Sequence, residues 1–152
     1  MQPARRLSIL LLSLVACGDA APREPITVVP TPTVDHHAHL LSPTLVADWK
    51  SLGVPFSRPD SAYTSALVLL EGQRLERAFL VSMAYFYGSA DLREALRLSA
   101  EAEGMRARGE NDWVAAEAAR APDRLVVFCG LAPGRPWAAG EARSCSDSLG
   151  VR

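Results

Sequence analysis

The sequence lacks the features that would point to several common partners. It has no run of five or more basic residues and no Gly-rich phosphate loop, and its formal net charge is -1. These absences remove the electrostatic case for nucleic acid as a partner and exclude a P-loop nucleotide site. Histidine is scarce, with three residues that all lie in one segment. Hydrophobic residues make up 49% of the chain and charged residues 22%, which predicts a globular protein rather than a disordered one.

The first 16 residues have the composition of an export signal. Arg5 and Arg6 precede the apolar run 7–15, which is shorter than the roughly 20 residues that span a bilayer. The run ends in Leu14-Val15-Ala16-Cys17, and this tetrapeptide resembles the lipobox of bacterial lipoproteins. The resemblance implies a signal peptide over 1–16, lipidation of Cys17, and an exported protein that is lipid-anchored at the periplasmic or cell-surface side of a bacterial membrane. An ordinary secretory signal and a twin-arginine signal are the alternatives.

Four prolines follow the signal, and they predict an extended tether over 17–32. They are Pro22, Pro25, Pro30 and Pro32. The globular part is therefore expected over 33–152. Within it, Cys129 and Cys145 could form a disulfide in an oxidising compartment, or Cys129 could remain free and buried within its apolar run.

Strands and helices are expected to alternate along the globular part. Strands are expected over 33–39, 77–83 and 125–131, and the last two are apolar. A first helix is expected from Pro43, with Ser42 as its cap, to just before Gly53. Further helices are expected over 61–75 and 89–108, and another begins at a cap at Asn111 and stops before Pro122. A last helix is expected over 137–149, with Gly150 after its end. The pattern predicts a parallel sheet covered by helices on both faces, in an α/β fold that is either an open sheet or a barrel. The chain has 152 residues, whereas an eight-stranded barrel needs about 250.

The segment Val34-Asp35-His36-His37-Ala38-His39-Leu40 carries the clearest chemical signal. Alternate side chains share one face of a strand, so His37 and His39 are expected on one face and His36 on the other. Two imidazoles at i and i+2 can hold one divalent metal ion, and neutral imidazole suits zinc. The alternative is that these histidines bind no metal, because His-x-His pairs are common.

The same segment resembles the start of the amidohydrolase superfamily, especially its amidohydrolase-related branch. Asp35, His37 and His39 match the Asp-x-His-x-His motif that ends the first strand of that family. The order of the segments 76–81, 111–114, 121–126 and 131–133 is also similar to the family pattern. The resemblance implies the N-terminal part, about three β/α units, of an incomplete TIM-type (β/α)8 barrel. It also implies that His37 and His39 are ligands of a divalent metal, zinc or alternatively manganese.

The implied activity is metal-dependent hydrolysis of amide, ester or lactone bonds in a small-molecule substrate, by water that the metal activates. The family takes its other ligands and its general base from later strands, and this chain has no histidine after His39. We therefore expect a truncated, inactive fragment of such an enzyme. The alternatives are a decarboxylase on the same barrel and a small non-enzymatic lipoprotein of the cell envelope.

Several other residues have two interpretations each. Asp35 could orient a histidine or the backbone from outside the metal site, or could be an ordinary strand-end hydrogen-bonding residue. Arg124 is expected to be structural rather than substrate-binding. Tyr85 and Tyr87 follow the second strand, at the end of a barrel where substrates bind. They could contact a substrate there, or they could be packing residues.

Overall fold

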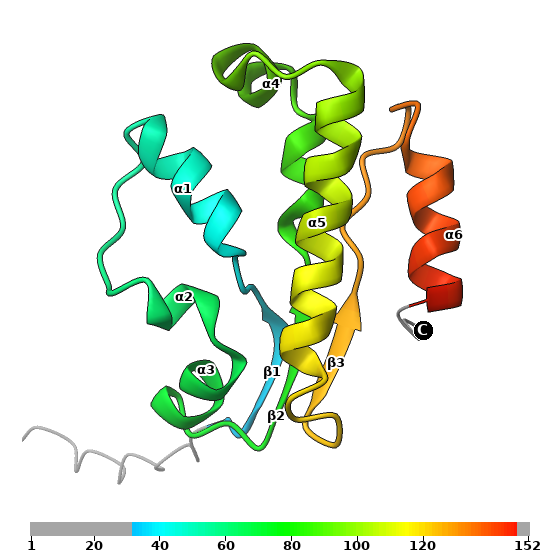
Figure 1. Ribbon diagram of the computed structural model, residues 1–152. Helices are drawn as coiled ribbons and strands as arrows, with labels where there is room; N and C mark the ends of the chain where they lie inside the picture. Colours follow the sequence, from blue (N-terminus) through cyan, green and yellow to red (C-terminus); the bar gives the residue numbers. More distant parts are fainter. Residues whose placement is uncertain (1–31, 149–152) are drawn as a thin grey trace, which may run out of the picture. The chain divides into compact units, whose positions relative to one another are not determined.

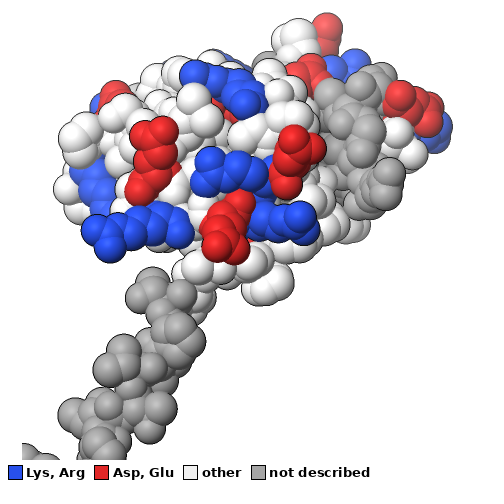
Figure 2. Space-filling view, turned by 90° about the horizontal axis from the view of Figure 1, so that it is seen from below, with Lys and Arg blue, Asp and Glu red and all other residues white. Residues whose placement is uncertain are grey.

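A computed structural model describes residues 32–148, and Figure 1 shows their arrangement. The expected signal peptide, Cys17, the proline-rich tether and Gly150 lie outside the described residues. Among the helices of the described part, none combines the length and the apolarity that crossing a membrane requires. On the face seen in Figure 2, acidic and basic side chains are interspersed over a largely uncharged surface.

Three short parallel strands form the sheet of the described chain, in the order β1-β2-β3. They are β1 (Val34–Ala38), β2 (Arg77–Val81) and β3 (Leu125–Phe128). Each lies within a segment that was expected to form a strand. The expectation of a barrel portion is wrong, because the described residues form only this small α/β sheet with β1 and β3 as open edges, and closure would need many more strands.

Short helices connect the strands, and side-chain caps begin most of them. Between β1 and β2 lie α1 (Pro43–Ser51), α2 (Ser61–Thr64) and α3 (Ala66–Gly72). After β2 come the 3-10 helix η1 (Met83–Gly88), α4 (Ala90–Leu96) and α5 (Ala100–Ala118), and after β3 comes α6 (Ala138–Ser148). The Ser42 hydroxyl accepts a hydrogen bond from the Leu45 N–H (3.0 Å), as the predicted cap of α1.

The predicted boundaries of the longer helices are wrong in two places. The expected helix over 61–75 is divided into α2 and α3, because Ser65 is extended and caps α3. The helix expected over 89–108 breaks at Arg97, whose backbone is left-handed (φ 53°). A new helix, α5, then starts after Ser99 and runs through Asn111, so Asn111 is not a cap.

The main core lies between one face of the sheet and the helices. Ala38, Ala78, Leu80 and Leu125 contribute from the strands, and they pack with residues of α3 and α5. On the opposite face, Val126 is 42% and Phe128 40% exposed. The described helices therefore cover one face of the sheet, and the expected coverage of both faces is wrong.

Helix α6 is held to the rest of the chain by a disulfide and by buried polar contacts. Cys129, directly after β3, is bonded to Cys145 of α6, which decides between the two interpretations of these cysteines. Glu141 of α6 is 2% exposed and accepts hydrogen bonds from Asn111 (2.9 Å) and Arg108 (3.0 Å). The covalent bond thus reinforces a charged contact that buries a carboxylate.

We predict that the disulfide contributes measurably to stability. It joins residues 16 apart, and closing a loop of that size restricts the unfolded chain by about 3 kcal/mol. A reductant should lower the thermal midpoint by roughly 10 °C, measured by circular dichroism. The variant Cys129→Ser/Cys145→Ser should melt at the lower temperature with or without reductant. A wild-type midpoint that reductant leaves unchanged, while thiol labelling shows both cysteines free, would contradict the prediction.

Candidate metal centre

An irregularity in β1 positions the histidines. Asp35 pairs with Ala78, but the next pair is Ala38 with Leu80, so β1 has one residue more than β2 in this interval. Such a bulge breaks strict alternation. His36 follows Asp35 in regular register and stacks on Phe79, the residue after Ala78 (ring centroids 5.2 Å apart), and the bulge then places Ala38 on the core face opposite Leu80. Because Phe79 lies between the core residues Ala78 and Leu80, this ring is on the face opposite the core.

The predicted orientation of His36, away from the other two histidines, is therefore wrong. His39 lies between Ala38 and Leu40, which are both buried in the core, so extended backbone places His39 on the open face as well. The His37 ring contacts the His39 ring edge-on, with centroids 4.7 Å apart. All three histidines thus belong to the open side of the sheet, although only two of them form a pair.

A backbone contact fixes the His39 ring. Its Nδ1 lies 2.7 Å from the carbonyl oxygen of Val81, at the end of β2. A carbonyl only accepts, so Nδ1 carries the proton and donates it. In the neutral ring, Nε2 is then left with a free lone pair. Histidines that ligate metals are generally oriented in this way by a hydrogen bond from the other ring nitrogen.

The free lone pair of His39 faces the second imidazole. The Nε2 atoms of His37 and His39 are 2.9 Å apart. Zinc–nitrogen bonds of about 2.0–2.1 Å place two ligand nitrogens about 2.9 Å apart at a right angle and about 3.4 Å apart at the tetrahedral angle. The separation is therefore close to that of two ligands of one ion. Without metal, the His37 Nε2–H can donate to His39 Nε2 across the same gap.

Asp35 acts on the backbone of the site. Its carboxylate accepts a hydrogen bond from the His37 backbone N–H (2.9 Å), which holds the bulged part of β1 in place. Within residues 32–148, no group of three or more His, Cys, Asp or Glu side chains is placed to hold a metal ion. The described chain thus brings together the two predicted ligands and no third.

The other candidates have contacts outside the histidine pair. Arg124 donates to the carbonyl oxygens of Leu75 (2.5 Å) and Glu76 (3.1 Å), and so joins the loops before β2 and β3. Tyr87 is 1% exposed, and its hydroxyl donates to Asp48 (2.9 Å). Burial, together with Asp48, raises the pKa of Tyr87. Tyr85 is 39% exposed but lies against Phe86 beside the sheet end.

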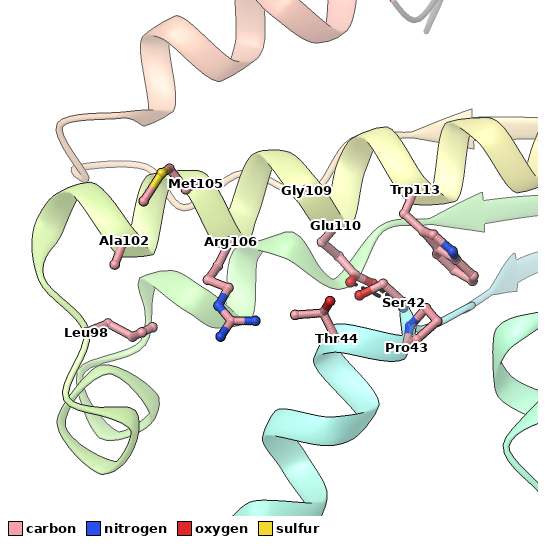
Figure 3. Close-up of a pocket in the computed structure, with 10 residues that line it drawn as sticks. All are labelled: Ser42, Pro43, Thr44, Leu98, Ala102, Met105, Arg106, Gly109, Glu110 and Trp113. Carbon is pink, nitrogen blue, oxygen red and sulfur yellow. Dashed lines mark hydrogen bonds between the residues drawn. The ribbon is translucent and has the colours of Figure 1, made fainter.

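A hollow of about 670 Å³ lies between the start of α1 and α5. Figure 3 shows Glu110 of α5 directed at Ser42 and Arg106 directed toward Thr44. The Glu110 carboxylate accepts from the Ser42 backbone N–H at 3.1 and 3.2 Å. It therefore satisfies a backbone N–H at the N-terminus of α1. This contact gives Glu110 a structural role beside the hollow.

Glu103 and Glu110 are two buried carboxylates on α5 that the sequence reasoning missed. They lie seven residues apart, and the buried residues Ala107 and Val114 share their face. This 3-4 spacing is that of a buried helix face, so it was the signal that both glutamates are internal. Charged residues on a helix are usually exposed to solvent, so these two glutamates were not recognised as buried.

The pKa values of the two carboxyl groups are shifted in opposite directions. Burial tends to raise the pKa of Glu103, but hydrogen bonds from Arg135 and Trp137 and the charges of Arg135 and Arg93 outweigh it, so the pKa is lowered. Glu110 has the Ser42 bonds but no cationic partner among the described residues. Burial therefore raises the pKa of Glu110, and the nearby charge of Asp48 adds to the effect.

No known protein family and no curated protein matches this chain. The interpretation of the histidine pair therefore depends on its geometry and on the sequence resemblance alone.

We predict that replacing glutamate by glutamine has different effects on stability at Glu103 and at Glu110. Glu103 has a depressed pKa, so its contribution to stability is present above the ordinary value of 4.5 and is lost as the pH falls through the folded-state pKa. Glu103→Gln should lower the free energy of unfolding at pH 7 by about 2–3 kcal/mol. Glu110 has a raised pKa, so its ionisation destabilises the fold as the pH rises above 4.5. Glu110→Gln should therefore be neutral or stabilising at pH 7, in urea titrations of both variants. Equal losses in the two variants would contradict this assignment.

Proposed function

We propose that this chain binds a divalent metal ion through His37 and His39, as the metal-binding strand of a metal-dependent hydrolase of the amidohydrolase-related type. The proposal depends mainly on one observation. His39 donates from Nδ1 to Val81, and its Nε2 is 2.9 Å from the His37 Nε2. Two ring nitrogens at ligand separation, one of them with its tautomer fixed, support zinc or manganese as the ion.

The residues of the site would have different tasks. His37 and His39 would hold the ion, the Val81 carbonyl would orient His39, and Asp35 would hold the backbone at His37. A bound divalent ion would supply Lewis acidity, which activates water for attack on an amide, ester or lactone. The exposed open face of the sheet would admit a small-molecule substrate.

A working hydrolase needs more than this pair. Catalytic zinc usually has three protein ligands, and a general base must be positioned beside it. The chain has no histidine besides His36, His37 and His39, and the described residues offer no third ligand. We therefore expect metal binding by this chain without appreciable turnover.

A second function, as a non-enzymatic metal-binding lipoprotein of the cell envelope, is favoured by a separate observation. The Cys129–Cys145 disulfide suits an oxidising compartment outside the cytoplasm. Together with the expected lipid on Cys17, it supports an exported, membrane-anchored protein. Turnover in the hydrolysis assays would favour the first function over this one, whereas metal binding is expected of both.

The metal site is tested by single substitutions in the three histidines. Zinc binding should be moderate, and His37→Ala or His39→Ala should weaken it at least about tenfold, because each removes one of two ligands. His36→Ala is the matched control, because His36 is adjacent in sequence but stacks on Phe79; it should change the affinity little. Calorimetric titration measures all three. The same loss in all three variants would show that the pair is not the site.

Hydrolysis is tested with the same proteins, loaded with zinc or manganese, against esters, lactones and amides. The expected rate is that of the metal alone. Turnover well above this blank, abolished in His37→Ala, would show that the pair suffices for catalysis and that the expected lack of activity is wrong.

The lipid anchor is tested by the mass of the membrane-extracted protein. The tetrapeptide 14–17 predicts a chain that begins at Cys17 and carries a diacylglyceryl group. Cys17→Ser should abolish the added mass and release the protein from the membrane fraction. A water-soluble wild-type protein with an unmodified Cys17 would contradict the prediction.

A further inference from the structure

The two sulfur atoms of the Cys129–Cys145 disulfide have different surroundings. Cys129, directly after β3, is half-buried, whereas Cys145 of α6 is 4% exposed. A thiolate that exchanges with a disulfide must reach the sulfur that it attacks. The attacking thiolate is also anionic, and the Glu141 carboxylate lies 3.7 Å from the sulfur of Cys145. Access and charge therefore both direct an external thiol to Cys129.

The carboxylate beside Cys145 is held in place by two donors. Its Oε1, the oxygen nearest the sulfur, accepts from Asn111 (2.9 Å), and its Oε2 accepts from Arg108 (3.0 Å). Glu141 is 2% exposed, whereas the Arg108 side chain is 56% exposed, so water screens the cation more than the carboxylate. The sulfur thus faces a buried carboxylate that its cationic partner neutralises only in part.

This carboxylate acts differently on the bonded and the free states of Cys145. In the disulfide the sulfur carries no proton, so its contact with Glu141 is not a hydrogen bond. A free thiol at the same place can donate its S–H to Oε1 of Glu141, whereas a thiolate is repelled by the negative charge. The thiolate is the form that attacks a disulfide. Glu141 therefore holds a freed Cys145 in the less reactive thiol form.

We propose that Cys129 is a site of modification by small thiols, and that Glu141 makes the resulting mixed disulfide long-lived. The external thiolate forms a bond to Sγ of Cys129, the bond to Cys145 breaks, and Cys145 leaves with the electron pair and takes a proton from water. One disulfide replaces another, so no oxidant is consumed. To close the disulfide again, the Cys145 thiolate must expel the small thiol, and Glu141 disfavours this thiolate.

Helix α6 keeps other contacts when the disulfide is open. Glu141 still joins α6 to Asn111 and Arg108 of α5. In the segment before α6, Arg135 and Trp137 donate to Glu103 of α5. The modified protein should therefore be less stable than the disulfide form but still folded, with Cys145 close to the modified Cys129.

Peptide mapping identifies the modified sulfur. The full chain has three cysteines, so a Cys17→Ser form of it retains only the pair in question. This protein is incubated with reduced glutathione, and its free thiols are then blocked with N-ethylmaleimide. We expect the glutathionyl group on Cys129 and the maleimide on Cys145. A glutathionyl group on Cys145, equal amounts on both sulfurs, or no adduct at all would overturn the proposal.

The role of Glu141 is tested on the isolated adduct, after glutathione is removed. Glu141→Gln removes the charge beside Cys145, which should raise the thiolate population about tenfold, while a thiolate that forms more easily is about threefold less nucleophilic. Loss of the glutathionyl mass, as the disulfide closes, should therefore be about threefold faster in the variant than in the wild type.

Arg108→Gln is the matched control, because it weakens the same contact of α6 but leaves the carboxylate in place. Without its cationic partner the carboxylate should repel the Cys145 thiolate more, so closure should be no faster than in the wild type. Circular dichroism at the assay temperature verifies that both variants are folded. Faster closure in both variants would mean that loosening of α6 controls the rate, and an unchanged rate in Glu141→Gln would mean that the charge has no effect. Either result would overturn the role of Glu141.

Discussion

The packing of α5 against a single face of the sheet is the constraint on which the rest of the fold depends. Val114 and Ala118 of this helix join the strand residues in the core, and Figure 1 shows α5 running alongside all three strands. Burial of apolar surface supplies the main driving force for such packing. Because the three-stranded sheet is small, the helices supply much of that surface, and Ala66, Leu69 and Leu70 of α3 join the residues of α5 there.

Polar residues on α5 then fix the chain that follows β3. The Asn111 side chain accepts from the Gly130 N–H (2.9 Å) and donates to the Gly130 carbonyl (3.2 Å). Gly130 has no room for a Cβ, which would collide with the Ser82 carbonyl oxygen. Glu103 binds the Arg135 guanidinium (2.5 and 2.7 Å) and the Trp137 indole N–H (2.6 Å) farther along. These bonds satisfy buried polar groups and set the direction in which α6 leaves the sheet.

The sequence was informative where the structure is local. The second and third strands follow from apolar runs and the Ser42 cap from the chemistry of a hydroxyl before Pro43, and all three are found. The bulge in β1 was not predictable, because it depends on how β1 pairs with β2, and it places Ala38 in the core and His39 on the open face. Asn111 resembled a helix cap because asparagine favours that position, whereas its partner Gly130 is distant in the sequence. The barrel was inferred from alternating strands and helices, and such alternation does not determine whether a sheet continues beyond its third strand.

The candidate site shows the same division between local pattern and long-range contact. The spacing of His37 and His39 was enough to suggest a pair, but the contact that orients it joins His39 to Val81, 42 residues away. That bond fixes the proton on Nδ1 of His39, so the proton between the two Nε2 atoms must belong to His37 when both rings are neutral. A metal ion placed between the same atoms must displace this proton, because each ligand nitrogen has to offer its lone pair. A proton and a metal ion therefore compete for the space between the two Nε2 atoms, and the pairing of β1 with β2 sets the distance between these atoms.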